Sequence, residues 1–124
     1  PMFRLLIAAG ALGAALSVIL GAFGAHGLKT RLTPEMLTTF ETGVQYQFYH
    51  SLGLILVGVI LHAVKTSTMV SAAGGLMVAG IILFSGSLYL ICFTGIRSFG
   101  MIAPIGGTAF IAAWLLLAIG VLRL

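Results

Sequence analysis

The chain has 124 residues, of which 60% are hydrophobic and 6% are charged, and its six Lys and Arg outnumber two Glu to give a net charge of +4. A soluble domain carries about 25% charged residues, so the hydrocarbon of a bilayer must be the main solvent of this chain. This composition excludes a cytosolic enzyme and a disordered tail. The isolated cations also form no basic stripe, so we expect membrane lipids and no nucleic acid as partners.

Uncharged apolar stretches predict four membrane-spanning helices, because about 20 apolar residues cross a hydrocarbon core about 30 Å thick. Their approximate ranges are 4–25, 45–64, 69–93 and 99–122. The sequence therefore predicts an all-α fold in which residues 1–124 form a single transmembrane domain. This domain is an integral membrane four-helix bundle with both termini on one side. Pro1 before Met2 is typical of a residue left by tag removal, so we expect a natural start at Met2.

The connection between the first two spans predicts a short amphipathic helix. Thr33 can cap its start, Pro34 suits the first helical position, and Glu35 faces the positive end of the helix. An apolar stripe then recurs at steps of three and four, formed by Leu37, Phe40, Val44 and Phe48. We expect this helix to lie at the membrane interface and to run on, or bend at Gly43, into the second span.

Small residues predict close packing between helices. Ala9, Gly13, Ser17, Gly21 and Ala25 follow one another at steps of four in the first span. This spacing predicts one nearly straight groove that lets another helix approach closely. Gly75 in the third span and Gly107 in the fourth are further candidates for such packing. Because small-residue grooves serve contacts within a chain and between chains, we also expect a homo-oligomer.

A cluster of polar side chains is predicted at one membrane interface, because His26 ends the first span and His50 lies near the start of the second. The candidate ligand-binding residues are His26, Glu41, Tyr46, Tyr49, His50 and Arg97. This cluster could bind a metal, relay protons, or hold the headgroup of a lipid or quinone. In the alternative interpretation, Glu41 pairs with Arg97, and the His and Tyr side chains bond to loop carbonyls and anchor the bundle.

A second polar patch, formed by Ser85, Ser87 and Tyr89, lies within the third span. Each serine can bond to a carbonyl of its own helix, whereas the Tyr89 hydroxyl needs a partner, which we expect from the first or fourth span. A small channel or carrier is an alternative function for the protein. Its polar path would be formed by Ser17, Ser85, Ser87, Tyr89 and Thr108.

Catalytic and metal-binding motifs are not apparent. Cys92 is the single cysteine and lies in an apolar run, and the sequence contains no Asp, so no Ser-His-Asp or Cys-His set can form. The two histidines of the interfacial cluster flank a long loop, unlike the ligands of compact zinc motifs, and no haem-attachment motif is present. We therefore expect no enzyme, no cofactor and no metal site, with a metal- or haem-binding redox protein as an alternative.

Four blocks of sequence carry a family resemblance: Gly21–Leu28, Tyr46–His50, Leu83–Tyr89 and Pro104–Gly107. In this order they resemble small bacterial inner-membrane proteins of unknown function, the YgdD-like proteins, which are related to eukaryotic transmembrane protein 256. The resemblance covers essentially the whole chain and implies four membrane helices, but no activity. Family motif positions would be His26, His50, Ser85, Ser87, Tyr89 and Pro104.

Together these observations predict a non-enzymatic, multi-pass protein of a bacterial inner membrane. We expect its function to be structural, or to be the binding of a lipid or another small hydrophobic molecule near His26 and His50.

Overall fold

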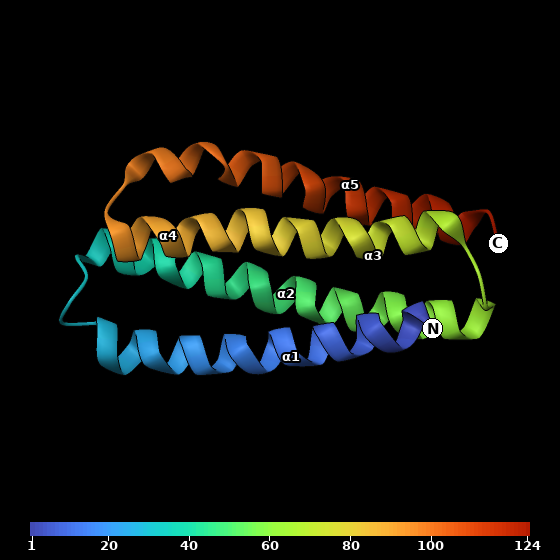
Figure 1. Ribbon diagram of the computed structural model, residues 1–124, viewed down its shortest axis with the longest axis horizontal. Coiled ribbons are helices and arrows are strands. Elements are labelled where there is room, and N and C mark those ends of the chain that lie inside the picture. The colour runs from blue at the N-terminus through green and yellow to red at the C-terminus, as the bar shows by residue number, and fades with distance from the viewer.

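A computed structural model describes residues 1–124, which form helices and no strands (Figure 1). Four helical segments are long and apolar enough to cross a membrane: Met2–Leu28, Pro34–Val64, Thr68–Thr94 and Arg97–Leu122. They run alternately in opposite directions, so the N- and C-termini lie at the same end of the molecule (Figure 1). The predicted all-α membrane bundle is confirmed.

Two of the four spans contain a π-helical turn. The first span consists of α1 (Met2–Phe23) and the π-helical turn η1 (Gly24–Leu28), and the second is the single helix α2 (Pro34–Val64). The third consists of α3 (Thr68–Gly80), the π-helical turn η2 (Ile81–Ser85) and α4 (Gly86–Thr94). A 3-10 turn, η3 (Arg97–Met101), leads into α5 (Ala103–Leu122).

The second span begins earlier than predicted. The Thr33 side chain accepts a hydrogen bond of 3.1 Å from the Met36 backbone N–H, which confirms the predicted helix start. From Pro34 the helix continues without interruption for 31 residues, about 46 Å at 1.5 Å per residue. The expected short helix therefore runs on into the second span, the first of the two expected alternatives, and forms the first turns of α2. Gly43 does not bend the helix but packs against the Tyr89 ring.

Glycines let α1 and α2 approach closely, as predicted, but along a different line. A Cβ at Gly10 would overlap the Ser51 carbonyl, and one at Gly13 would overlap the Ser51 hydroxyl. The buried residues of the first span are Leu6, Gly10, Ser17, Gly24 and Leu28, whereas Ala9 and Ala25 are exposed. Residues four apart advance about 40° around an α-helix at each step, so the predicted five cannot share one groove. A contact line that alternates steps of three and four stays on one face.

The helix α2 is the most buried of the spans and lies between α1 and the third span. The spans follow one another side by side in chain order, which leaves α1 and α5 at opposite edges (Figure 1). A core near the termini joins α1, α2, α3 and α5 through Leu6, Leu54, Val57, Leu61, Val70, Met77 and Ala113. A smaller core at the other end consists of Leu28, Phe40 and Cys92. Large apolar side chains cover the outer surface, which suits contact with lipid.

Most of the predicted packing residues contact a neighbouring helix. Gly13 and Ser17 lie between α1 and α2, and a Cβ at Gly21 would make ordinary contact with Val44, at 3.6 Å. A Cβ at Gly107 would meet only the Phe84 ring, at 3.9 Å. Gly75 has no neighbour in the chain within 4 Å, so it does not pack helices within the chain.

Candidate functional site

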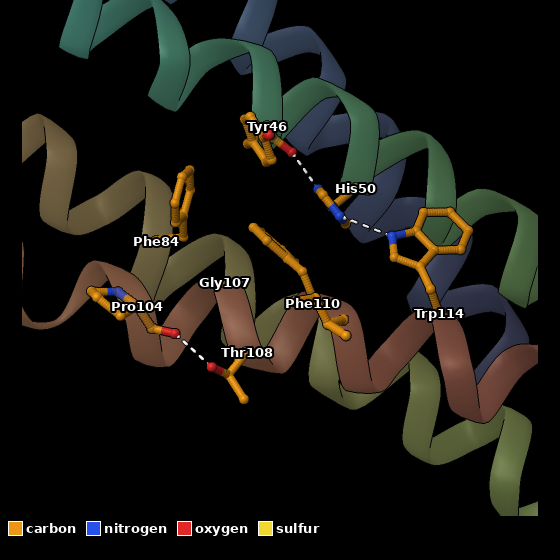
Figure 2. A pocket seen from close by; sticks show the side chains of 9 residues that line it. Tyr46, His50, Phe84, Pro104, Gly107, Thr108, Phe110 and Trp114 are labelled. Atoms are coloured by element: carbon orange, nitrogen blue, oxygen red, sulfur yellow. Dashed lines mark hydrogen bonds between the residues drawn. The ribbon is translucent and has the colours of Figure 1, made fainter.

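A cavity of about 530 Å³ lies between α2, η2 and α5 (Figure 2). Its walls are formed by Tyr46, His50, Phe84, Pro104, Gly107, Thr108, Phe110, Ile111 and Trp114. The cavity lies near the middle of the bundle, since His50 lies near the middle of α2 and Trp114 near the middle of α5. The rim residues Ile111 and Trp114 are 64% and 40% exposed on the outer surface. In a bundle of membrane-spanning helices, an apolar outer surface of this kind suits contact with lipid.

Helical spacing brings the lining residues together. Tyr46 and His50 lie one turn apart on α2, and on α5 the positions 107, 110, 111 and 114 recur at steps of three and four, so they share one face. Gly106 positions η2 beside them, because a Cβ there would lie 2.8 Å from the Phe84 Cα. Only a glycine lets the backbone of α5 approach η2 this closely. Since π-helical turns are frequent at functional sites, the position of η2 in the cavity wall supports a functional role.

Both ring nitrogens of His50 are engaged in hydrogen bonds (Figure 2). The Trp114 indole N–H, which can only donate, donates to His50 Nε2 across 3.0 Å. The proton of a neutral imidazole must therefore be on Nδ1, which lies 2.7 Å from the Tyr46 carbonyl and donates to it. The imidazole also stacks on the Phe110 ring, with 3.5 Å between centroids and 11° between planes. In this arrangement, His50 has no free lone pair for a metal or a haem iron.

The predicted interfacial cluster does not come together in the structure. His26 is exposed, and its Nδ1 lies 2.9 Å from the carbonyl of Ala22 in its own helix. Gln47, which lies near His50 on α2, donates a hydrogen bond to the Gly13 carbonyl of α1. Gly13 is about 20 Å from His26 along the first span, so His50 and His26 are far apart. The cause is the early start of α2 at Pro34, which moves His50 from the predicted interface to mid-span.

The other members of that cluster are also separate. Arg97 lies 3.6 Å from Glu35, so the expected pairing of Arg97 with Glu41 is wrong. Glu41 is exposed, and the Tyr49 hydroxyl accepts a hydrogen bond from Gln45. No three His, Cys or acidic side chains lie close enough together to hold a metal ion. Of the six candidates, only Tyr46 and His50 share a site.

The polar patch of the third span connects helices instead of lining the cavity. The Ser85 hydroxyl donates to the Gly43 carbonyl of α2 across 2.6 Å, so the expected bond within its own helix is wrong. Ser87 does bond within its own span, to the Phe84 carbonyl at 2.8 Å. The Tyr89 hydroxyl donates to Gln47 of α2, not to the first or fourth span as expected.

The hydroxyls nominated for a transport path lie in separate places. Ser17 donates to the Gly13 carbonyl within α1, whereas Thr108 donates to the Pro104 carbonyl beside the cavity. The remaining three, Ser85, Ser87 and Tyr89, bond to Gly43, Phe84 and Gln47. All five hydroxyls donate to oxygen atoms of the protein, and they line no common passage in the structure.

Sequence reasoning missed four of the nine residues that line the cavity. The sequence does not single out Phe84, Phe110, Ile111 or Trp114 as site residues. The available signal was the spacing of Gly107, Phe110 and Trp114 on one face of the fourth span. That signal is ambiguous, since apolar residues at helical spacing are equally typical of a packed core.

Comparisons with known proteins identify membrane relatives. The model of a family described as "Protein of unknown function (DUF423)" matches residues 20–107. A UPF0382 membrane protein of Staphylococcus haemolyticus is 48% identical over 97% of both chains. The UPF0382 membrane protein YwdK of Bacillus subtilis is 44% identical over 97% of this chain and 98% of its own length. No solved structure matches the chain. With four spans and these relatives, the chain is a multi-pass membrane protein.

Proposed function

Because the chain belongs to the DUF423 family of membrane proteins of unknown function, as its resemblance indicated, we propose a function from the cavity itself. The protein binds a small, uncharged, hydrophobic molecule that enters from the lipid between α2 and α5. The observation that carries this proposal is a cavity of about 530 Å³ near the middle of the bundle, with four aromatic rings in its wall.

The size and lining of the cavity support this proposal. Pockets for small molecules are typically about 300–1,000 Å³, mostly apolar, with a few placed polar groups. Four aromatic side chains line this cavity, namely Tyr46, Phe84, Phe110 and Trp114. Their rings pack against one another, with centroids 4.8 Å apart for Tyr46 and Phe84 and 5.7 Å apart for Phe84 and Phe110. This mutual packing holds the wall in place before a ligand arrives, which lowers the entropic cost of binding.

The absence of charge in the wall selects an uncharged ligand. None of the eight charged side chains lines the cavity. A phosphate or carboxylate there would be buried without a partner, which is costly at this depth. A lipid headgroup therefore does not suit the site, whereas a neutral ring or hydrocarbon does.

We propose binding without catalysis. His50 would be the natural acid or base, but both of its nitrogens are engaged in hydrogen bonds. Cys92 does not line the cavity; it is buried and lies 3.3 Å from the Met36 carbonyl. The cavity therefore offers no free imidazole or thiol, which favours a carrier, sensor or structural role over an enzymatic one.

Native mass spectrometry of the protein released gently from detergent tests this proposal. We expect one uncharged molecule on the wild type and its loss from Gly107→Leu. A Cβ at Gly107 meets only the Phe84 ring at 3.9 Å, so it fits without a clash, and we expect the rest of the leucine side chain to occupy the cavity that Gly107 lines. Gly75→Leu is the matched control, because it makes the same change beside open space on α3. A wild type with only random phospholipid adducts, or a ligand that survives Gly107→Leu, would overturn the proposal.

Self-association forms a second part of the proposal. Gly75 is exposed on α3, and a Cβ there would have no neighbour within 4 Å, so a second copy could approach closely. We expect an oligomer in the same spectra and a lower oligomer number for Gly75→Leu. The spectrum gives the number of protein copies and the mass of the retained ligand separately. A change in oligomer number therefore leaves Gly75→Leu usable as the control for ligand loss in Gly107→Leu. A monomeric wild type would refute self-association alone.

A further inference from the structure

The polar groups of the cavity are almost all bound to the protein. His50 and Trp114 bond to each other, and Thr108 donates to the Pro104 carbonyl across 2.8 Å. The hydroxyls of Tyr49 and Tyr89 also have partners in the chain, at Gln45 and Gln47. The Tyr46 hydroxyl makes no hydrogen bond to the protein, although Tyr46 lines the cavity and is 38% exposed. In lipid, an unpartnered hydroxyl is costly, so it needs an acceptor from outside the chain.

The shape of the wall favours a flat molecule. The imidazole of His50 lies parallel to the Phe110 ring, at 11°, and nearly parallel to the Tyr46 ring, at 17°. Beside these rings, Gly107 has no side chain, and the nearest atom to a Cβ there would be 3.9 Å away. Aromatic faces and a flat helix surface suit a planar ring, which gains stacking contacts that a flexible acyl chain does not.

From these two features we infer that the ligand is a flat, uncharged ring that carries a carbonyl oxygen, the chemistry of a quinone. This inference rests on the proposed function and specifies its ligand. The carbonyl accepts the hydrogen bond that the Tyr46 hydroxyl donates, and the ring stacks beside Phe110. A phenol is a better donor than acceptor, because its oxygen lone pair is delocalised into the ring, so a carbonyl matches it better than an alcohol. Any hydrocarbon tail leaves past the exposed Ile111 toward lipid.

The protein contains a built-in probe for this ligand, since Trp114 is the only tryptophan and lines the cavity. The full-length protein in detergent is titrated with 2-methyl-1,4-naphthoquinone, and Trp114 fluorescence is recorded. We expect saturable quenching, which Gly107→Leu abolishes and Gly75→Leu leaves unchanged. Tyr46→Phe keeps the ring but removes the donor, so the affinity falls about three- to tenfold, as for one lost hydrogen bond. Tyr49→Phe, the same change outside the cavity, has no effect.

The carbonyl is tested by competition with 2-methylnaphthalene, which has the same fused rings and no oxygen. Its binding is read as relief of the quenching by the quinone. We expect it to bind more weakly than the quinone does, and its affinity to be the same in wild type and Tyr46→Phe. If Tyr46→Phe binds the quinone as tightly as the wild type does, or if the two ring compounds bind the wild type equally well, the inference is wrong.

The failure of this inference is distinguishable from that of the proposed function. A retained mass that Gly107→Leu removes, together with no saturable quenching by the quinone, leaves the binding function standing and overturns the choice of ligand. A retained molecule with a charged headgroup overturns both, because the proposed function specifies an uncharged ligand. No retained mass and no quenching refute both.

Discussion

The Tyr89 hydroxyl of α4 donates a hydrogen bond of 2.7 Å to the Gln47 side-chain oxygen of α2. The amide nitrogen of the same Gln47 donates to the Gly13 carbonyl of α1, at 2.9 Å. One buried side chain therefore connects three of the spans. Because lipid offers no replacement partner, these bonds fix the heights of the three helices relative to one another.

Gln47→Leu is expected to lower the free energy of unfolding by about 1–3 kcal/mol, because it removes two hydrogen bonds and leaves the Tyr89 hydroxyl without its acceptor. Reversible unfolding in mixed micelles measures the change. The control is Gln45→Leu, since Gln45 is exposed and bonds only to Tyr49. Adding Tyr89→Phe to Gln47→Leu should cost less than the two single changes together. Strict additivity would show that this hydrogen bond does not couple the helices.

His50 is expected to carry its proton on Nδ1 alone. The Trp114 N–H occupies Nε2, so only Nδ1 can donate to the Tyr46 carbonyl. Nitrogen-15 NMR of histidine-labelled protein distinguishes the two tautomers. Trp114→Phe removes the donor to Nε2 and should change the His50 signals, while those of the exposed His26 stay the same. A proton on Nε2 in the wild type would contradict the geometry.

Gly10→Ala is expected to destabilise the protein by about 1–3 kcal/mol, the usual cost of overpacking. The added methyl group would overlap the Ser51 carbonyl and lie 2.8 Å from Ile55 Cγ1. Gly86→Ala makes the same change on α4, where a Cβ would meet no atom within 4 Å, and should not lower stability, because alanine is the better helix former. Thermal melting in detergent compares the two. An equal melting temperature for both variants would show that α1 and α2 are not in close contact at Gly10.

Arg97→Ala is expected to change the free energy of unfolding by less than about 1 kcal/mol, since it removes only a surface ion pair. The Arg97 and Glu35 side chains are 73% and 78% exposed, and their charged atoms are 3.6 Å apart. Melting curves at low and high salt should coincide for the wild type and the variant. A larger loss would mean that the pair holds η3 against the start of α2.

The number and type of helices followed from composition, because each uncharged run of sufficient length has one stable form in lipid. The start of α2 also followed from local chemistry at Thr33, Pro34 and Glu35. The position of His50 in the bundle did not, because the predicted second span begins near Gln45, whereas α2 begins at Pro34 and has His50 near its middle.

The candidate site could be predicted only in part, because its members come from three segments far apart in the chain. Tyr46 and His50 were singled out as polar groups that need a reason to be in lipid. Phe84, Phe110 and Trp114 carry no such signal, since aromatic side chains are ordinary in membrane helices. The partner of Tyr89 was also not predictable, because it depends on how η2 turns α4 relative to α2.

The π-helical turn at Ile81–Ser85 divides the third span into two halves with different neighbours, since α3 packs mainly on α5 and α4 packs on α2. Such a turn holds one residue more than an α-helical turn. Deleting that residue would leave a continuous helix but rotate α4 by about 100° around its axis, which would turn Tyr89 away from Gln47. At η2, a one-residue change in chain length therefore changes which face of α4 points toward α2.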